Sequence, residues 1–504
     1  MGDQAQPVNA SRIFRTVENI SAHGLPNIGR AATHKRRLVW ACLFLAGFGF
    51  FLSQSSQLIV RFLKYNVNVN VELGFETEAT FPAVTFCNLN RIPLLAVLSD
   101  GKFLQLQGLI DGFLEHQEYQ SWDYDLTYDE IDTSFAITAL SIDILSSLPY
   151  ANRSSTGHPL SDMMLSCTFR GYPCSPKNFT HFYNYLYGNC YTFNFYGRRA
   201  QKVTQAGPFG GLTMELYIDQ PQYVPGLQNS AGVKVFISEQ NQVPFPEDKG
   251  VIVGPGYETS IALKKVRIDR IGEPYTNCSK GASTIYSDFY ENVEYSLLAC
   301  EKSCVVREIL KACQCADVRY RFTDEHKPCY SSNMTLTDCA NRIHEAYAYN
   351  NLDCHCQLPC REDVFEETVS TALWPNDNYQ PLMEAAVKNI SPRFSYDLEN
   401  DENFVSKNLV KLNVFMSSLQ YQHIFQTPEY GSENLISDLG GQVGFWMGFS
   451  ILTLFEIVEM IFDLIVTTCG KLKMRKRVSD KLKDMEGLDV PTVSSTVNTI
   501  TPVE

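Results

Sequence analysis

One stretch of this chain decides its fold: Asp438-Leu-Gly-Gly-Gln-Val-Gly-Phe-Trp-Met-Gly-Phe-Ser-Ile-Leu-Thr-Leu-Phe-Glu-Ile-Val-Glu-Met-Ile-Phe-Asp463. From Leu439 to Val466 it is apolar and, at about 1.5 Å per helical residue, long enough to cross a hydrocarbon core of about 30 Å. Glu456, Glu459 and Asp463 interrupt it at steps of three and four residues, which places them on one helical face. Carboxylates within a membrane span usually face a bundle interior or a water-filled path, so they predict a cation pathway. The alternative is an anchor helix whose acidic end lies among the lipid headgroups.

A second apolar segment covers residues 38–60. Its first half is uniformly apolar, whereas its second half, from Ser53 to Gln57, is polar on several sides, which favours contact with protein or a wet cavity over contact with lipid alone. Lys35, Arg36 and Arg37 precede this segment, and a basic cluster at 471–477 follows the other one. Basic residues mark the cytoplasmic side, so we expect both termini inside and the residues between the spans outside.

The cysteines test this topology independently. Fourteen of the 16 lie between the two apolar segments, and an even number confined to an extracellular region predicts a disulfide framework. The alternative is zinc binding by the pairs Cys313-x-Cys315 and Cys354-x-Cys356. Five glycosylation sequons lie in the same region, headed by Asn152, Asn178, Asn277, Asn333 and Asn389.

Composition narrows the class of protein. The net charge is −14 although basic clusters flank both apolar segments, so the region between them is more acidic than the total. Such a surface attracts cations and disfavours a nucleic-acid partner. No hydrolase triad, phosphate-binding loop or metalloprotease motif has supporting context. We therefore expect no enzyme, no cofactor and no metal centre.

The region between the spans has both strand and helix patterns. A helix is predicted over Tyr295–Leu310, where cysteines four residues apart share one face. Together the patterns predict a central sheet beside a disulfide-laced helical subdomain. The expected strands are β-rich or alternate between apolar and polar residues, and they cover residues 81–87, 212–219, 232–238, 259–268 and 408–416, the last returning the chain to the second span.

A set of short motifs occurs in a fixed order along the chain. They are His23-Gly24, Phe81-Pro-Ala-Val-Thr-Phe-Cys-Asn-Leu-Asn90, Gly188-Asn-Cys-Tyr-Thr-Phe-Asn194, Pro274-Tyr275 before Cys278, the ten-cysteine cluster, Trp374-Pro375, Leu439-Gly-Gly-Gln442 and Gly448-x-Ser450. Over about residues 20–470 this order resembles the degenerin/epithelial sodium channel/acid-sensing ion channel superfamily.

The resemblance implies an α+β membrane protein with two transmembrane helices flanking a large disulfide-rich extracellular domain, which has a central β-sheet and peripheral helical thumb and finger subdomains. It implies a homotrimer, or a heterotrimer with related subunits, in the plasma membrane. The implied segments are residues 1–37 (cytoplasmic, with the His-Gly motif), 38–60 (first transmembrane helix), 61–435 (extracellular), 436–468 (second transmembrane helix) and 469–504 (cytoplasmic).

The resemblance also assigns roles at the pore. Gly448, Phe449 and Ser450 match the Gly-x-Ser selectivity filter, where glycine permits an unusual backbone and carbonyl or hydroxyl oxygens face the ion. The alternative is a contact between helices through small residues. Phe449 is bulkier than the residue often found there, so the exact Na/K selectivity stays open. The implied partners are sodium ions, the blocker amiloride and membrane lipid.

Five further residues match gating positions. His23 and Gly24 match a cytoplasmic gating motif, and Ser437 matches a pore-mouth position that tolerates only small side chains. Tyr65 and Tyr275 match an aromatic pair that couples the first span to a loop of the thumb. The alternative is an ordinary loop pair for His23 and Gly24, and ordinary packing residues for Tyr65 and Tyr275.

Disulfide partners follow only from the resemblance, because spacing does not fix them. The implied pairs are Cys87–Cys190, Cys167–Cys174, Cys278–Cys360, Cys300–Cys356, Cys304–Cys354, Cys313–Cys339 and Cys315–Cys329, of which the last five form a nested ladder.

The sequence is compatible with more than one stimulus for opening the channel. Proton-gated relatives carry a histidine after the tyrosine that Tyr65 matches, whereas this chain has Asn66 and Val67. Stretches such as Val243-Pro-Phe-Pro-Glu-Asp248 are more similar to the invertebrate neuropeptide-gated branch. We expect an extracellular peptide ligand, with protons as the first alternative and a non-conducting two-span receptor as the alternative from another class.

Overall fold

The computed structural model describes residues 25–119, 128–196, 200–281, 293–320, 326–329, 334–390 and 401–448, together with Leu398, Ser450 and six positions between 455 and 466. The chain divides into two compact units. The first comprises residues 1–67 and 428–504, and the second comprises residues 68–427.

The second unit is built on a mixed eight-stranded sheet. Its strand order is β1-β17-β12-β16-β9-β4-β5, and β15 pairs with β12. Along one edge β12 is parallel first to β16 and then to β17, whereas β15 runs antiparallel to the whole of β12. The strands are β1 (Val67–Phe75), β4 (Met164–Phe169), β5 (Tyr172–Pro173), β9 (Leu212–Tyr217), β12 (Tyr257–Asp269), β15 (Arg361–Leu373), β16 (Leu409–Met416) and β17 (Gln420–Pro428).

A second, five-stranded sheet has the order β11-β10-β3-β7-β6. Its strands are β3 (Ala83–Asn88), β6 (Phe179–Asn184), β7 (Gly188–Phe193), β10 (Val233–Ser238) and β11 (Val251–Val253). Apolar residues of both sheets form one core, in which the Phe81 ring lies 5.1 Å from that of Phe169 and 6.3 Å from that of Phe193. The alternating sequence of β9 supplies part of this core, because Leu212, Met214 and Leu216 all point inward. Two short strand pairs complete the sheets: β2 (Ala79–Thr80) with β8 (Lys202–Val203), and β13 (Cys278–Ser279) with β14 (Leu358–Pro359).

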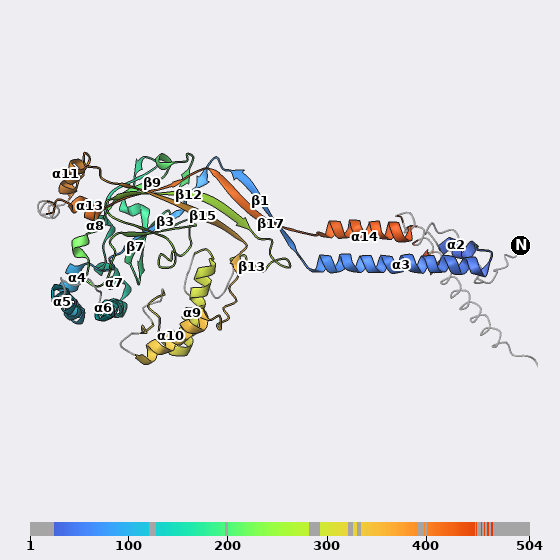
Figure 1. Cartoon of the computed structure of the whole chain (residues 1–504), viewed down its shortest axis with the longest axis horizontal. Coiled ribbons are helices and arrows are strands. Elements are labelled where there is room, and N and C mark those ends of the chain that lie inside the picture. Colours follow the sequence, from blue (N-terminus) through green and yellow to red (C-terminus); the bar gives the residue numbers. More distant parts are fainter. Residues whose placement is uncertain are drawn as a thin grey trace, which may run out of the picture. The chain divides into compact units, whose positions relative to one another are not determined.

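Helices α4 to α7 form a separate cluster with its own apolar core, centred on residues such as Val97, Leu106 and Ile137. Helices α9 and α10 lie side by side (Figure 1). The α9 helix begins where the Ser296 side chain accepts a hydrogen bond from the Ala299 amide, and it ends at Gln314 in a left-handed conformation. The helices of this unit are α4 (Leu94–Ser99), α5 (Leu104–Tyr119), α6 (Tyr128–Ser147), α7 (Tyr150–Thr156), α8 (Leu160–Met163), α9 (Leu297–Cys313), α10 (Met334–Ala348), α11 (Gln380–Ile390) and α13 (Phe404–Asn408).

The first unit consists of helices α2 (Leu25–Arg30), α3 (His34–Leu63) and α14 (Ser432–Met447). The long helix α3 includes the predicted span 38–60 and, among the described residues, is the one helix long and apolar enough to cross a membrane. Helices α3 and α14 pack along each other (Figure 1).

All five predicted strands and the predicted helix at 295–310 are present. One connection differs from expectation: the strand at Leu409–Met416 lies between β12 and β9, and the chain returns toward α14 through β17 instead. Two consecutive strands fit here because both pair with β12, at successive parts of its length. The apolar run from Leu439 to Val466 is also not one unbroken helix, since α14 ends at Met447.

Candidate functional site

Gly448 ends helix α14. Its φ of 63° lies in the left-handed region, which glycine adopts without the steric cost of a Cβ, and its amide donates to the Gly444 carbonyl at 3.0 Å. Two residues further on, Ser450 is exposed. The helix is therefore interrupted at the predicted filter motif. Phe449, Glu456, Glu459, Asp463, His23 and Gly24 lie outside the described residues.

The polar half of α3 contacts α14. The Trp446 indole N–H donates to Gln54 Oε1 at 3.1 Å, and its ring stacks on Phe50 with ring centroids 5.1 Å apart. Gly47 lies beside this contact, because a Cβ there would be 3.4 Å from the Trp446 carbonyl oxygen. Gln54 thus lies against protein and Ser55 is buried, as their pattern predicts, whereas Ser53, Ser56 and Gln57 are exposed.

A polar clamp holds the end of α3 to the start of α14. Arg61 pairs with Glu429 at 2.7 Å, and the same carboxylate accepts from Asn66 at 3.0 Å. Tyr430 lies beneath the Arg61 guanidinium and donates its hydroxyl to Asp438 at 2.7 Å. Ser437, next to Asp438, is exposed on α14.

The predicted aromatic pair falls into the two different units. Tyr65 belongs to the first unit and has a left-handed backbone with φ 50°, and its ring packs 5.8 Å from that of Phe62. Tyr275 belongs to the second unit, in a turn where its amide donates to Gly272 at 3.0 Å. Their mutual contact stays a prediction.

Seven disulfides brace the second unit, and they join the same pairs that the resemblance implies. Two of them fasten α9 to the segment after α10, and two more lie at the far end of α9. Another joins β13 to the start of β15. Of the sequon residues, Asn152, Asn178 and Asn277 are exposed, whereas Asn333 and the Asn389 side chain lie outside the described part of the chain.

The second unit contains a partly open cavity of about 460 Å³ that sequence reasoning did not find. Its walls come from α6, α7, β6, the loop after β10 and the segment after α9. Aromatic side chains dominate the walls: Tyr150, Phe182, Tyr183, Tyr185, Phe195, Tyr196, Phe245 and Tyr320. Small-molecule sites are typically concave, largely apolar and about 300–1,000 Å³ in volume.

Charged groups at the cavity are held in place. Arg153 lies over the rings of Tyr150 and Tyr183, at 6.0 and 5.8 Å. Glu247 accepts from Lys302 at 2.6 Å and from Asn184 at 2.7 Å. Burial raises the pKa of Tyr183 to about 12, so this phenol stays neutral at physiological pH.

The far wall of the cavity is fixed by a second group of polar contacts. The Asp317 carboxylate contacts the side-chain nitrogens of Arg319 and His344, both at 2.7 Å. The Tyr320 ring stacks on the His344 ring. Burial alone would raise the pKa of Asp317, but the hydrogen bonds from His344 and Arg319 outweigh it and hold this pKa below its ordinary range. The cavity wall formed by residues 318–320, after α9, is thereby held against α10.

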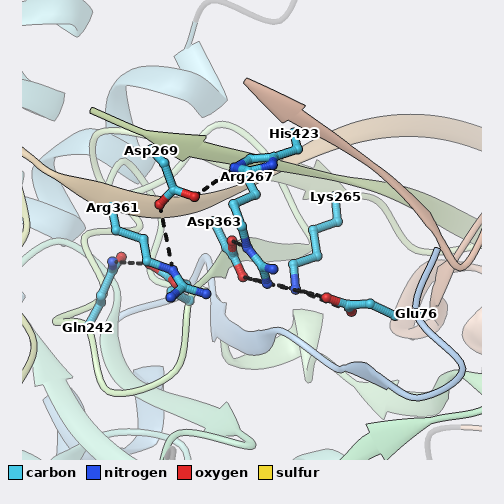
Figure 2. A network of polar contacts seen from close by, with 9 residues as sticks. Glu76, Gln242, Lys265, Arg267, Asp269, Arg361, Asp363 and His423 are labelled. Carbon is cyan, nitrogen blue, oxygen red and sulfur yellow. Dashed lines mark hydrogen bonds and ion pairs between the residues drawn. The ribbon is translucent and has the colours of Figure 1, made fainter. Parts of the chain in front are cut away.

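A polar network crosses the large sheet at another place (Figure 2). Asp363 on β15 lies directly opposite Arg267 on β12 and accepts its Nε at 2.9 Å. Lys265, two residues earlier, reaches Asp363 at 2.9 Å and Glu76 at 3.3 Å. Arg267 also contacts Glu76 at 3.3 Å. Two cations and two carboxylates thus connect β12, β15 and the segment that follows β1.

Comparison with known proteins identifies the family. Residues 16–460 match the family model described as amiloride-sensitive sodium channel. The match covers most of the chain, and the chain therefore belongs to the amiloride-sensitive sodium channel family, a family of ion channels.

Several relatives are similar over nearly the whole length. The epithelial sodium channel subunit beta-2 of Xenopus laevis is 28% identical, with 95% of this chain and 88% of the relative aligned. The epithelial sodium channel subunit alpha of Neoceratodus forsteri is 27% identical over 95% of this chain and 83% of the relative. The degenerin-like protein asic-2 of Caenorhabditis elegans is 27% identical over 97% of this chain and 93% of the relative.

Proposed function

We propose that this chain is the subunit of a trimeric, amiloride-blocked, sodium-selective channel of the plasma membrane, opened by an extracellular peptide. Membership of the amiloride-sensitive sodium channel family supports the proposal that the protein conducts sodium. Residues 38–60 and 436–468 then cross the membrane, residues 61–435 are extracellular, and residues 1–37 and 469–504 are cytoplasmic.

The pore assignment rests on the interruption of α14. With Gly448 in a left-handed conformation, the backbone after Met447 leaves the helix, which supports a filter in which oxygens of residues 448–450 face the ion. Glu456, Glu459 and Asp463 attract cations below it, and His23-Gly24 acts in gating.

The aromatic cavity supports the peptide ligand. Its volume of about 460 Å³ accommodates aromatic side chains, and the tyrosines and Arg153 that line it stack readily on such rings. Its walls belong to elements that lie far apart in the chain, from α6 to the segment after α9. A ligand that binds them more tightly in the open arrangement shifts the channel toward opening, whereas equal affinity shifts nothing.

The test of the proposed function is electrical. Expressed alone in cells, the chain should give an amiloride-blocked sodium current when a panel of short amidated peptides is applied. A step from about pH 7.4 to about pH 6 without peptide should give little current, because the position after Asn66 is Val67 rather than a titratable histidine. A large transient current with acid alone assigns the protein to the proton-gated class, and surface expression without any current assigns it to the non-conducting receptors.

Binding and coupling are separable by a set of alanine variants. Tyr150→Ala and Tyr196→Ala remove aromatic rings that line the cavity yet are 39% and 62% exposed, so the fold should tolerate them while peptide binding weakens. Tyr65→Ala and Tyr275→Ala should instead leave binding intact and reduce opening. Labelled-peptide binding and peptide-evoked current, measured on the same cells, distinguish the two groups. Tyr172→Ala, at a tyrosine 74% exposed on β5, is the matched control and should change neither. Unchanged binding in both cavity variants would move the ligand site elsewhere.

A further inference from the structure

Lys302 of helix α9 is a buried cation that lies outside the lining of the aromatic cavity. Its side chain is 11% exposed, and its ammonium nitrogen lies 2.6 Å from a Glu247 oxygen and 2.5 Å from an Asp248 oxygen. The centroid of the Phe245 ring lies 4.2 Å from the same nitrogen, which is within the range of a cation–π contact. One lysine thus holds three residues of the loop between β10 and β11.

This loop forms one wall of the cavity, through residues 243–245 and Glu247. Its apolar side packs on the start of α9, because Phe245 belongs to the same buried cluster as Ala299 and Cys300. The pair of ion contacts to Lys302 adds an attachment where the loop continues toward β11. The wall is therefore fastened to α9 by apolar and by ionic contacts.

Glu247 extends the attachment to a second wall. Its other carboxylate oxygen accepts a hydrogen bond from Asn184 Nδ2 at 2.7 Å, and Asn184 is the last residue of β6. The side-chain oxygen of Asn184 in turn accepts from the main-chain amides of Leu186 and Tyr187, at 2.9 and 3.2 Å. Since residues 180–185 line the cavity, this series of contacts ends in the turn that closes the second wall.

A third wall lies close to the same lysine. The centroid of the Tyr320 ring, in the segment after α9, is 5.9 Å from the Lys302 nitrogen. Three walls of the cavity therefore meet at one ammonium group behind them. A neutral residue at position 302 would leave the carboxylates of Glu247 and Asp248 without the cation that they share, and a buried charge that loses its partner is costly.

We propose that Lys302 is a positioning residue for the ligand site: its ammonium group holds the loop between β10 and β11, and the turn after β6, in the arrangement that binds the peptide. The role in binding rests on the proposed function. Without this charge the loop occupies other arrangements for part of the time, and the apparent affinity falls in proportion to the fraction of channels that stays competent to bind. The peptide concentration needed for opening then rises, whereas the current at saturating peptide stays the same.

Hydrogen–deuterium exchange of the full chain in lipid nanodiscs tests the attachment without any ligand. Lys302→Met removes the charge and keeps an unbranched side chain. In this variant the amides of Leu186, Tyr187 and Asp248 should exchange faster, because their acceptors lie in the released segments. The amides of α9 should keep their wild-type exchange, since methionine is a good helix former. The control is Lys311→Met, the same substitution at a lysine of α9 that is 75% exposed, and it should match wild type.

Peptide binding and peptide-evoked current test the positioning. If about one tenth of the Lys302→Met channels keep the competent arrangement, the dissociation constant of a labelled peptide and the concentration for half-maximal current should both rise about tenfold. The maximal current per surface channel should stay normal, and Lys311→Met should follow wild type in all three quantities. Lys302→Arg keeps the charge and should restore most of the affinity.

A milder variant covers the case in which Lys302→Met does not reach the cell surface. Asp248→Asn removes one of the two carboxylates at a partly exposed position, so the fold should tolerate it. It should raise the same two concentrations by a smaller factor and speed exchange in the loop.

The possible results separate the parts of the proposal. Wild-type exchange of all three amides in Lys302→Met overturns the attachment. Faster exchange with an unchanged peptide dissociation constant overturns the positioning role, and so does a loss of surface channels and maximal current without any shift in peptide concentration. Faster exchange in the variant, together with a wild-type chain that neither binds nor responds to any peptide, keeps the attachment and overturns the proposed function instead.

Discussion

Ser437→Trp should hold the channel persistently open. Ser437 is a small, exposed residue of α14, and in the proposed trimer it packs against its symmetry mates at the closed pore mouth. A bulky side chain there overpacks the closed state, at a cost of about 1–3 kcal/mol. Because the open state does not bear this cost, the ratio of open to closed channels should rise about five- to about 200-fold.

The measurement is the amiloride-blocked current in the absence of ligand. Ser437→Cys should behave like wild type until a bulky thiol reagent is applied and should then open without ligand. Ile436→Trp is the matched control, since Ile436 is 71% exposed one residue away and a step of about 100° around the helix turns it from the same contact. Normal closure of the modified cysteine variant, with modification confirmed, would refute the pore-mouth position.

Ser450→Val should change ion selectivity or abolish the current while surface expression stays normal. Valine is larger than serine, branched and without a hydroxyl, so it adds bulk and removes an oxygen two residues after the left-handed Gly448. A hydrogen bond to a charged group contributes about 1.5–3 kcal/mol, which corresponds to about a ten- to hundredfold change in an ion's relative permeability. Larger replacements at the same position should act at least as strongly.

Reversal potentials in sodium and potassium solutions measure this change directly. Ser432→Val is the control, because it makes the same substitution at the exposed first residue of α14. An unchanged reversal potential across several Ser450 variants that still conduct would exclude residues 448–450 as the filter.

Local patterns are enough to predict most of the sheet. The alternating residues of β9, β10 and β12 have their apolar side in the core, and pattern reasoning places them within about two residues. The helical subdomain follows from the cysteine pair on one face of α9 and from the resemblance. The break in α14 is harder to predict, because a glycine in an apolar run is equally compatible with a continuous helix.

The cavity and the polar network of Figure 2 depend on topology instead. Arg267 and Asp363 face each other only because β12 and β15 are antiparallel in one particular register, and a slip of one residue would turn every side chain of β15 to the other face. Glu76 comes to the same place from a third segment, far away in the chain. No spacing in the sequence carries that information, because it depends on how distant segments pair in the sheet.

The nesting of the five ladder disulfides has a consequence for biosynthesis. The chain emerges from the ribosome from its amino end, and the second cysteines of these pairs then appear in the order Cys329, Cys339, Cys354, Cys356 and Cys360. Each of these cysteines pairs with a cysteine that lies earlier in the chain than the partner before it. The sequence separations of the five pairs are 14, 26, 50, 56 and finally 82 residues. Every bond already made shortens the free loop that the next one must close, which lowers its entropic cost. Like the stem of an RNA hairpin, this part of the protein can therefore be closed in a single pass during synthesis, without threading one segment through another.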